Sequence, residues 1–89
     1  MPEMHLEIIN KLGLHARAAA KFVATASAFQ ADILLCKDDR CANGKSIMGI
    51  MMLAAGKGSQ ISVRAEGDDA DAALAALKEL INRRFNEDE

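Results

Sequence analysis

A histidine and an arginine near the start of the chain have the residue types and the spacing for phosphoryl chemistry. His15 directly precedes an alanine-rich segment, and Arg17 follows two residues later. A helix that begins after His15 would place the imidazole beside unpaired backbone N–H groups and the positive end of the helix dipole. That position disfavours a charged ring and keeps a nucleophilic nitrogen available. The guanidinium of Arg17 adds a fixed positive charge with a donor fork that suits phosphate.

The elements that must position these two residues follow from hydrophobic periodicity. Alternating apolar residues indicate strands, and apolar residues at helical spacing indicate helices. We expect strands at residues 4–9, 32–37, 40–43 and 61–66, and helices at 16–27, 47–53 and 70–84. This order predicts an α+β fold with a largely antiparallel four-stranded sheet and three helices on one face, in a single domain spanning 1–89. Ser46 and residues 67–69 are expected to cap helices, and residues 86–89 to fray.

Composition and charge exclude several classes of protein. The chain has 89 residues, of which 51% are apolar, and a net charge of −2. These values argue against disorder and against a global attraction to nucleic acid. The longest apolar run, 47–55, is too short to span a bilayer, and no signal peptide is visible, so we expect a cytoplasmic protein without membrane insertion. In that compartment Cys36 and Cys41 are expected to be free thiols, with pairing across a hairpin turn as the alternative.

Two separate segments resemble the histidine-containing phosphocarrier (HPr) family of the bacterial phosphoenolpyruvate-dependent phosphotransferase system. Residues 13–17, Gly-Leu-His-Ala-Arg, are similar to the phosphohistidine loop of the family. Residues 43–51, Asn-Gly-Lys-Ser-Ile-Met-Gly-Ile-Met, are similar to its regulatory-serine segment and stand at the family's spacing. Ala18 departs from the proline that many members carry. With Asn-Lys-Leu at 10–12, it is similar to proteobacterial members, including the nitrogen-related NPr branch, and favours a regulatory system.

The resemblance implies an open-faced β-sandwich and a set of site residues. It makes His15 the phosphohistidine, modified on Nδ1, with Ala16 and Arg17 binding the phosphate, and it makes Ser46 a site of regulatory phosphorylation. The second helix is too apolar to bury every side, so Ile47 and Met48 are expected to be exposed. A docking surface for partners is predicted from three side chains of this helix: Ile47, Met48 and Met51.

The resemblance also implies partners. Enzyme I would donate the phosphoryl group, IIA-type proteins would accept it, and an HPr kinase/phosphorylase would modify Ser46. We expect a monomer that carries phosphate as cargo, needs no cofactor and performs no independent catalysis.

Two other functions are consistent with parts of the sequence. A regulatory interaction protein that acts mainly through Ser46 and the apolar surface is the principal alternative, and a small nucleic-acid-binding module is a weaker one. The segment 44–46 ends like a P-loop, but Asp39 stands where that motif needs glycine. Two cysteines and two histidines could bind zinc by ligand type, but the histidines lack paired spacing, so no metal is expected. His5 lies on the first predicted strand, where a structural role is expected.

Overall fold

Four strands and three α-helices form in the order that the sequence predicts. The structure is a computed structural model that describes residues 2–87. Its elements are β1 (Glu3–Glu7), α1 (Ala16–Ser27), β2 (Asp32–Lys37), β3 (Arg40–Asn43), α2 (Ile47–Met52), β4 (Gln60–Glu66), α3 (Ala70–Asn82) and a 3₁₀ turn, η1 (Arg84–Asn86). The predicted bounds agree with these to within two residues. None of the helices formed by residues 2–87 has the length and apolar character that a membrane span requires.

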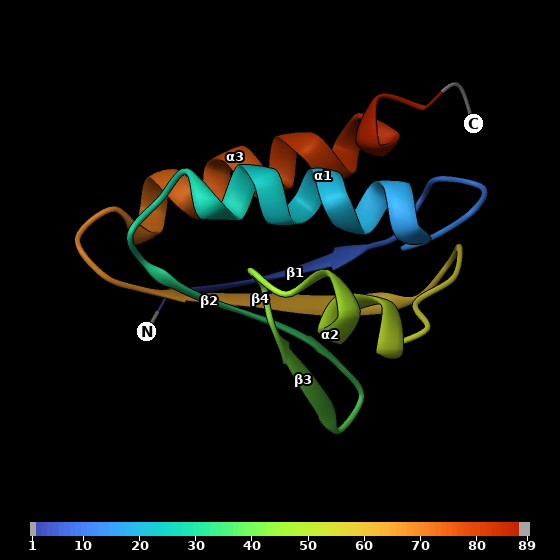
Figure 1. Cartoon of the computed structure of the whole chain (residues 1–89), viewed down its shortest axis with the longest axis horizontal. Coiled ribbons are helices and arrows are strands. Elements are labelled where there is room, and N and C mark those ends of the chain that lie inside the picture. The colour runs from blue at the N-terminus through green and yellow to red at the C-terminus, as the bar shows by residue number, and fades with distance from the viewer. Residues whose placement is uncertain (1, 88–89) are drawn as a thin grey trace.

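The sheet is antiparallel throughout and has the strand order β1-β4-β2-β3. The last strand, β4, therefore lies inside the sheet and pairs with β1 on one side and β2 on the other. Figure 1 shows α1 and α3 side by side over one face of this sheet, with α2 beside β3. The predicted α+β fold, with an open antiparallel sheet and three helices, is confirmed.

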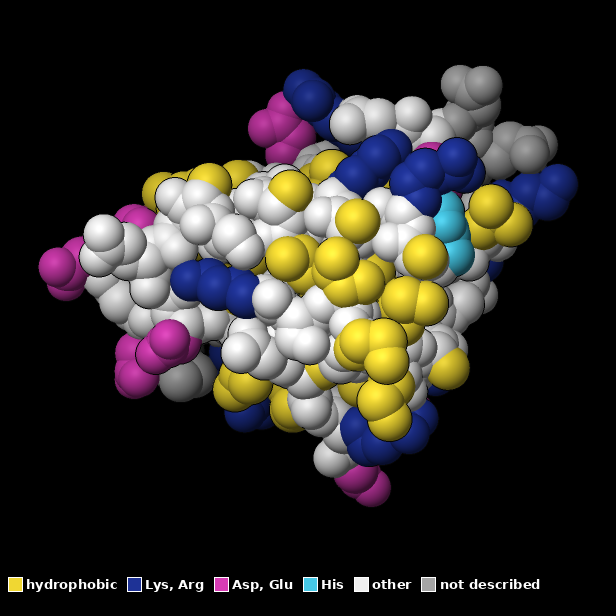
Figure 2. Space-filling model, viewed as in Figure 1, with side chains coloured by type: hydrophobic (Ala, Val, Ile, Leu, Met, Phe, Trp, Pro, Cys, Tyr) yellow, Lys and Arg dark blue, Asp and Glu magenta, His cyan; other side chains and the backbone are white. Residues whose placement is uncertain are grey.

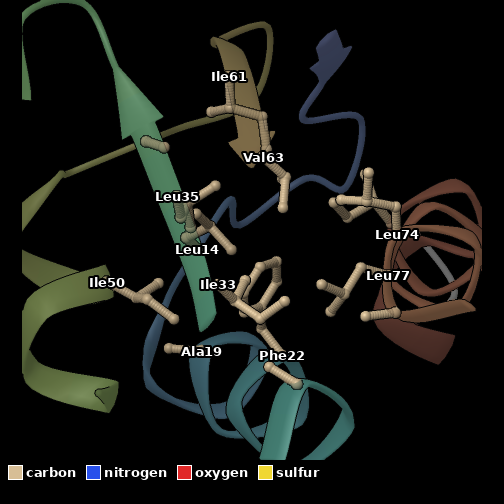
Figure 3. Close-up of a cluster of buried hydrophobic side chains, with 14 of the residues drawn as sticks. Leu14, Ala19, Phe22, Ile33, Leu35, Ile50, Ile61, Val63, Leu74 and Leu77 are labelled. Carbon is tan, nitrogen blue, oxygen red and sulfur yellow. The ribbon is translucent and has the colours of Figure 1, made fainter. Parts of the chain in front are cut away.

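The core lies between the sheet and the helices because both contribute one apolar side. Ile61, Val63 and Ala65 alternate along β4 as buried residues, while Arg64 and Glu66 between and after them face solvent. Figure 3 shows side chains from β2, β4, α1, α2 and α3 converging on this layer. The buried helical side chains are Ala18, Ala19, Phe22, Ala26, Ile50, Ala70, Ala73, Leu74, Leu77 and Ile81.

The expectation of two free thiols is wrong for this structure, because Cys36 and Cys41 form a disulfide. The two residues are direct partners in the β2–β3 ladder, across the turn at residues 38–39, and their Cα atoms are 4.0 Å apart. Opposite residues of an antiparallel pair project from the same face at short range. The predicted hairpin therefore places the two sulfurs together, and two cysteines suffice for this local bridge.

The expectation of a frayed tail is also wrong for Asn86 and Glu87, while residues 88–89 lie outside the described part of the chain. Asn86 ends η1, and Glu87 lies against the loop before α1. The physical reason is Phe85, whose side chain is only 1% exposed in the core. Lys21 Nζ also donates a hydrogen bond to the Phe85 carbonyl oxygen at 2.6 Å. These contacts fix the segment that follows α3.

The last helix has an aspartate at the expected N-cap position, but the side chain of this residue does not cap the helix. Asp69 is the N-cap of α3, but its side chain makes no hydrogen bond to that helix. Its carboxylate instead accepts hydrogen bonds from the backbone N–H groups of Gln30 and Ala31, at 2.8 and 2.9 Å. Asp69 therefore fastens the loop after α1 to the start of α3.

Candidate functional site

His15 occupies the N-cap of α1. Its backbone is extended, with φ −75° and ψ 178°, and its carbonyl oxygen accepts a hydrogen bond from Ala19 N–H at 2.8 Å. The imidazole makes no capping hydrogen bond to the N–H groups of α1. The N–H groups in the first turn of a helix have no intrahelical acceptor, so those of Ala16 and Arg17 are available to an anion beside the ring.

The loop that delivers His15 to this position depends on a glycine. Gly13 has φ +68°, and a Cβ atom added to it would lie 2.5 Å from the carbonyl oxygen of Ala55 and 2.7 Å from Gly56 Cα. The next residue, Leu14, donates its N–H to the same Ala55 oxygen at 2.8 Å. The segment that follows α2 therefore supports the loop directly, and only glycine allows so close an approach.

A carboxylate from the other end of the chain contacts the imidazole. Nε2 of His15 lies 2.5 Å from Oε2 of Glu87, which is 72 residues away in sequence. The second carboxylate oxygen of Glu87 accepts a hydrogen bond from Asn10 Nδ2 at 2.9 Å. Arg17 approaches the same group more loosely, with its Nε atom 3.8 Å from Oε2. The His15 and Glu87 side chains are 23% and 12% exposed, so the contact is shielded but open to a partner.

The charge of Glu87 decides which ring nitrogen is free. Burial tends to raise the pKa of Glu87, but hydrogen bonds from Asn10 and His15 and the charges of His15 and Arg17 outweigh it and hold the pKa below its usual value. An ionised carboxylate only accepts hydrogen bonds, so Nε2 must carry the proton. In the neutral ring Nδ1 then keeps its lone pair.

The second segment, residues 43–51, contains the start of α2, as the sequence predicts. Ser46 is the N-cap, and its Oγ accepts a hydrogen bond from Gly49 N–H at 3.1 Å. Figure 2 shows apolar side chains gathered over α2 on the same face as a histidine. We call the three exposed residues Ile47, Met48 and Met51 the α2 surface; they are 41%, 71% and 39% exposed.

The structure brings the two predicted segments onto one face through the packing of α1 against α2. Sequence reasoning missed several residues here. Leu12 is 60% exposed in the loop before His15, and Met52 is 70% exposed at the end of α2. It also missed Asn10 and Glu87. The signal for Glu87 was Phe85, since a lone aromatic residue in a polar tail indicates that the tail packs back onto the core.

The described residues contain no set of ligands for the zinc site that the residue types alone would allow. Residues 2–87 contain no group of three or more His, Cys, Asp or Glu side chains arranged to hold a metal ion. Cys36 and Cys41 are bonded to each other. His5 lies on β1 with a side chain 77% exposed, 3.7 Å from Glu3.

Comparisons with known proteins find similar sequences and structures over most or all of the chain. A family model described as "PTS HPr component phosphorylation site" matches residues 2–83. The chain is 53% identical to the phosphocarrier protein HPr of Pseudomonas aeruginosa over the full length of both. It is 44% identical to the phosphocarrier protein NPr of Shewanella violacea, over 96% of this chain and 93% of that one. Among solved structures, an HPr from Thermoanaerobacter tengcongensis superposes with a TM-score of 0.96 at 49% identity, over the whole of both chains.

Proposed function

Because the chain belongs to the HPr family of phosphocarrier proteins of the phosphotransferase system, we propose that it accepts a phosphoryl group from phosphorylated enzyme I on Nδ1 of His15 and passes it to a IIA-type acceptor. The observation that carries this proposal is the position of the ring. Within residues 2–87, Nε2 contacts Glu87, whereas Nδ1 has no hydrogen-bond partner at the open N-terminus of α1.

The chemistry is a transfer between nucleophiles. The lone pair of Nδ1 forms a bond to phosphorus while the bond between phosphorus and the donor breaks, and Nε2 keeps its proton. Such transfers depend mainly on positioning and on stabilising the charge of the phosphoryl oxygens. The N–H groups of Ala16 and Arg17 supply fixed donors. The Arg17 guanidinium is 68% exposed and only loosely paired with Glu87, so it can turn to the phosphate.

The α2 surface is the docking surface of the proposed carrier. Its methionine side chains adapt to differently shaped partners, which suits a protein that meets enzyme I and a IIA-type acceptor in turn. In this proposal, the protein works as a cytoplasmic monomer and has no cofactor or metal of its own.

Ser46 is the proposed regulatory site, modified by an HPr kinase/phosphorylase. A phosphate on its hydroxyl would lie beside the Gly49 N–H that the hydroxyl now caps and the other N–H groups of the first turn, so α2 would remain folded. The added negative charge would lie next to the α2 surface and repel acidic partners. The alternative function, regulation mainly through Ser46 and this surface, is favoured by the exposure of Met48.

Phosphorylation by enzyme I and phosphoenolpyruvate tests the carrier function. We expect wild-type protein to gain one acid-labile phosphoryl group by mass spectrometry, and His15→Ala to gain none. His5→Ala is the matched control, because His5 lies exposed on β1, and it is expected to gain the group as wild type does. Wild-type protein that gains no phosphoryl group contradicts the carrier function and leaves the regulatory alternative.

The affinity for enzyme I tests the docking role of the α2 surface. Met48→Ala is expected to accept the phosphoryl group to the same end point but to bind enzyme I about tenfold more weakly, the usual loss at an interface anchor. Leu34→Ala changes a 36% exposed apolar residue on β2, away from α2, and is expected to bind as wild type does. Equal affinity for all three proteins contradicts the docking role.

A further inference from the structure

We propose that Glu87 is a positioning residue for His15, one that fixes the proton on Nε2 and points Nδ1 toward the incoming phosphoryl group. This proposal rests on the proposed function of His15. Glu87 lies beyond residues 2–83, the part of the chain that the family model matches.

The first support is a chain of hydrogen bonds from the buried loop to the ring. Asn10 is fully buried, and its Nδ2 donates to the carbonyl oxygen of Gly13 at 2.8 Å as well as to Glu87. The amide orientation follows from these two acceptors, because the opposite orientation would place its oxygen against them. Asn10 Oδ1 has no hydrogen-bond partner within residues 2–87, so the amide serves as a donor. The Glu87 carboxylate is thus held on one oxygen and contacts His15 with the other.

The second support is the conformation of η1, which aims Glu87 at the ring. Arg84, Phe85 and Asn86 have φ angles of 55°, 56° and 62°, in the left-handed region that L-residues rarely adopt. Consecutive residues in this region persist only where the surroundings hold them there. The buried Phe85 side chain and the Lys21 hydrogen bond provide that hold. Tertiary contacts rather than local preference therefore bring the Glu87 carboxylate to His15.

The arrangement has a chemical consequence in both states of the carrier. Before transfer, the carboxylate holds the Nε2–H form of the ring and leaves the Nδ1 lone pair facing outward. As Nδ1 bonds to phosphorus, positive charge develops on the ring, and the carboxylate at Nε2 stabilises it. Nε2 remains a donor throughout, so the contact need not break during transfer.

The test compares Glu87→Ala with Glu79→Ala in the full chain. Glu79 is the matched control because it lies exposed on α3 and its carboxylate pairs with Arg83. Without enzyme I, proton and nitrogen NMR of wild type and Glu79→Ala should show a protected, downfield Nε2–H resonance for His15. Glu87→Ala should lose this resonance while backbone resonances of the core remain in place. A structural role of Glu87 alone would not produce this signature.

The rate of phosphoryl transfer gives a second result. With enzyme I and phosphoenolpyruvate, Glu87→Ala should reach the same end point of one phosphoryl group, about tenfold more slowly than Glu79→Ala, as expected for loss of a charge-assisted hydrogen bond. An Nε2–H resonance that persists in Glu87→Ala or is missing from wild type overturns the proposal, and so does an unchanged rate. Failure of wild type to accept phosphate would contradict the carrier function instead, since the NMR comparison needs no transfer.

Discussion

The first turns of α1 and α2 carry the two candidate modification sites, and they are built in opposite ways. Ser46 caps its own helix: its hydroxyl oxygen bonds to Gly49 N–H, and its own N–H bonds to the carbonyl oxygen of Asn43. His15 stands at the same position of α1 but makes no cap, and its ring contacts Glu87 near the other end of the chain. One helix start is local in sequence, and the other is assembled from distant segments.

This difference separates stability from chemistry. The Ser46 side chain caps α2, so its role in this structure is to stabilise the start of that helix. The His15 side chain leaves the first-turn donors of α1 open, and the Asn10–Glu87 pair orients the ring from outside the helix. A helix start that must bind an anion cannot also be filled by its own N-cap side chain. The proposed phosphohistidine site therefore depends on long-range contacts.

The strongest test of this dependence is Gly13→Ala. The new methyl group would meet the Ala55 carbonyl oxygen at 2.5 Å, and the backbone would remain at a positive φ that alanine disfavours. Strain and overpacking together should lower the free energy of unfolding by about 2–4 kcal/mol, measured by urea denaturation. We also expect slower phosphoryl transfer, because the loop carries His15.

Gly56→Ala is the matched control for this change. No heavy atom lies within 4 Å of a Cβ added there, so the loss should stay below about 0.5 kcal/mol. Similar losses in both variants would show that the contact between Gly13 and the segment after α2 does not define the α1 start.

The same contrast explains what the sequence could and could not predict. The Ser46 cap and the exposure of Met48 were predictable because both depend on a few neighbouring residues. His15 at a helix start was predictable for the same reason. The contact of Glu87 with His15 was not. Phe85 indicates that the tail packs onto the core, but the direction of Glu87 depends on a left-handed turn that local preference disfavours.

The disulfide shows a different limit of sequence reasoning. The hairpin at residues 38–39 was predicted, and with it the possibility that Cys36 and Cys41 face each other. The expectation of free thiols came from the number of cysteines and from the expected compartment, neither of which reports geometry. Register, rather than composition, decides whether two sulfurs meet.

A smaller effect is expected at the local helix start. Ser46→Ala removes the acceptor for Gly49 N–H and should lower the free energy of unfolding by about 1 kcal/mol. Ser46→Asp keeps a capping oxygen and should retain most of that stability. Urea denaturation measures both, with Ser59→Ala in the loop before β4 as the control. Phosphoryl acceptance by His15 should be unchanged in Ser46→Ala, and a large loss of acceptance there would mean that the two helix starts are not independent.

The third helix start is an intermediate case, because Asp69 stands at the N-cap of α3 but bonds to the loop after α1. The N–H of Gln30 is the largest cause of a lowered pKa for Asp69; burial opposes it, while the N–H of Ala31 and the charge of Lys45 add to the lowering. A carboxyl whose pKa is lower in the folded state stabilises the fold above its unfolded pKa, about 3.9. This stabilisation is lost as the pH falls through the lower, folded value.

Asp69→Asn therefore gives the smallest and most pH-dependent effect. Its melting temperature should lie below that of wild type at about pH 6, and the gap should narrow as the pH is lowered from about 4, because wild type then loses the same charge. Asp71→Asn, in the first turn of α3, is the control for a general change of helix charge. A gap that stays constant with pH would show that the hydrogen bonds to Gln30 and Ala31 do not depend on the carboxylate charge, and Asp69 would then be, like Ser46, a helix start held by neutral hydrogen bonds.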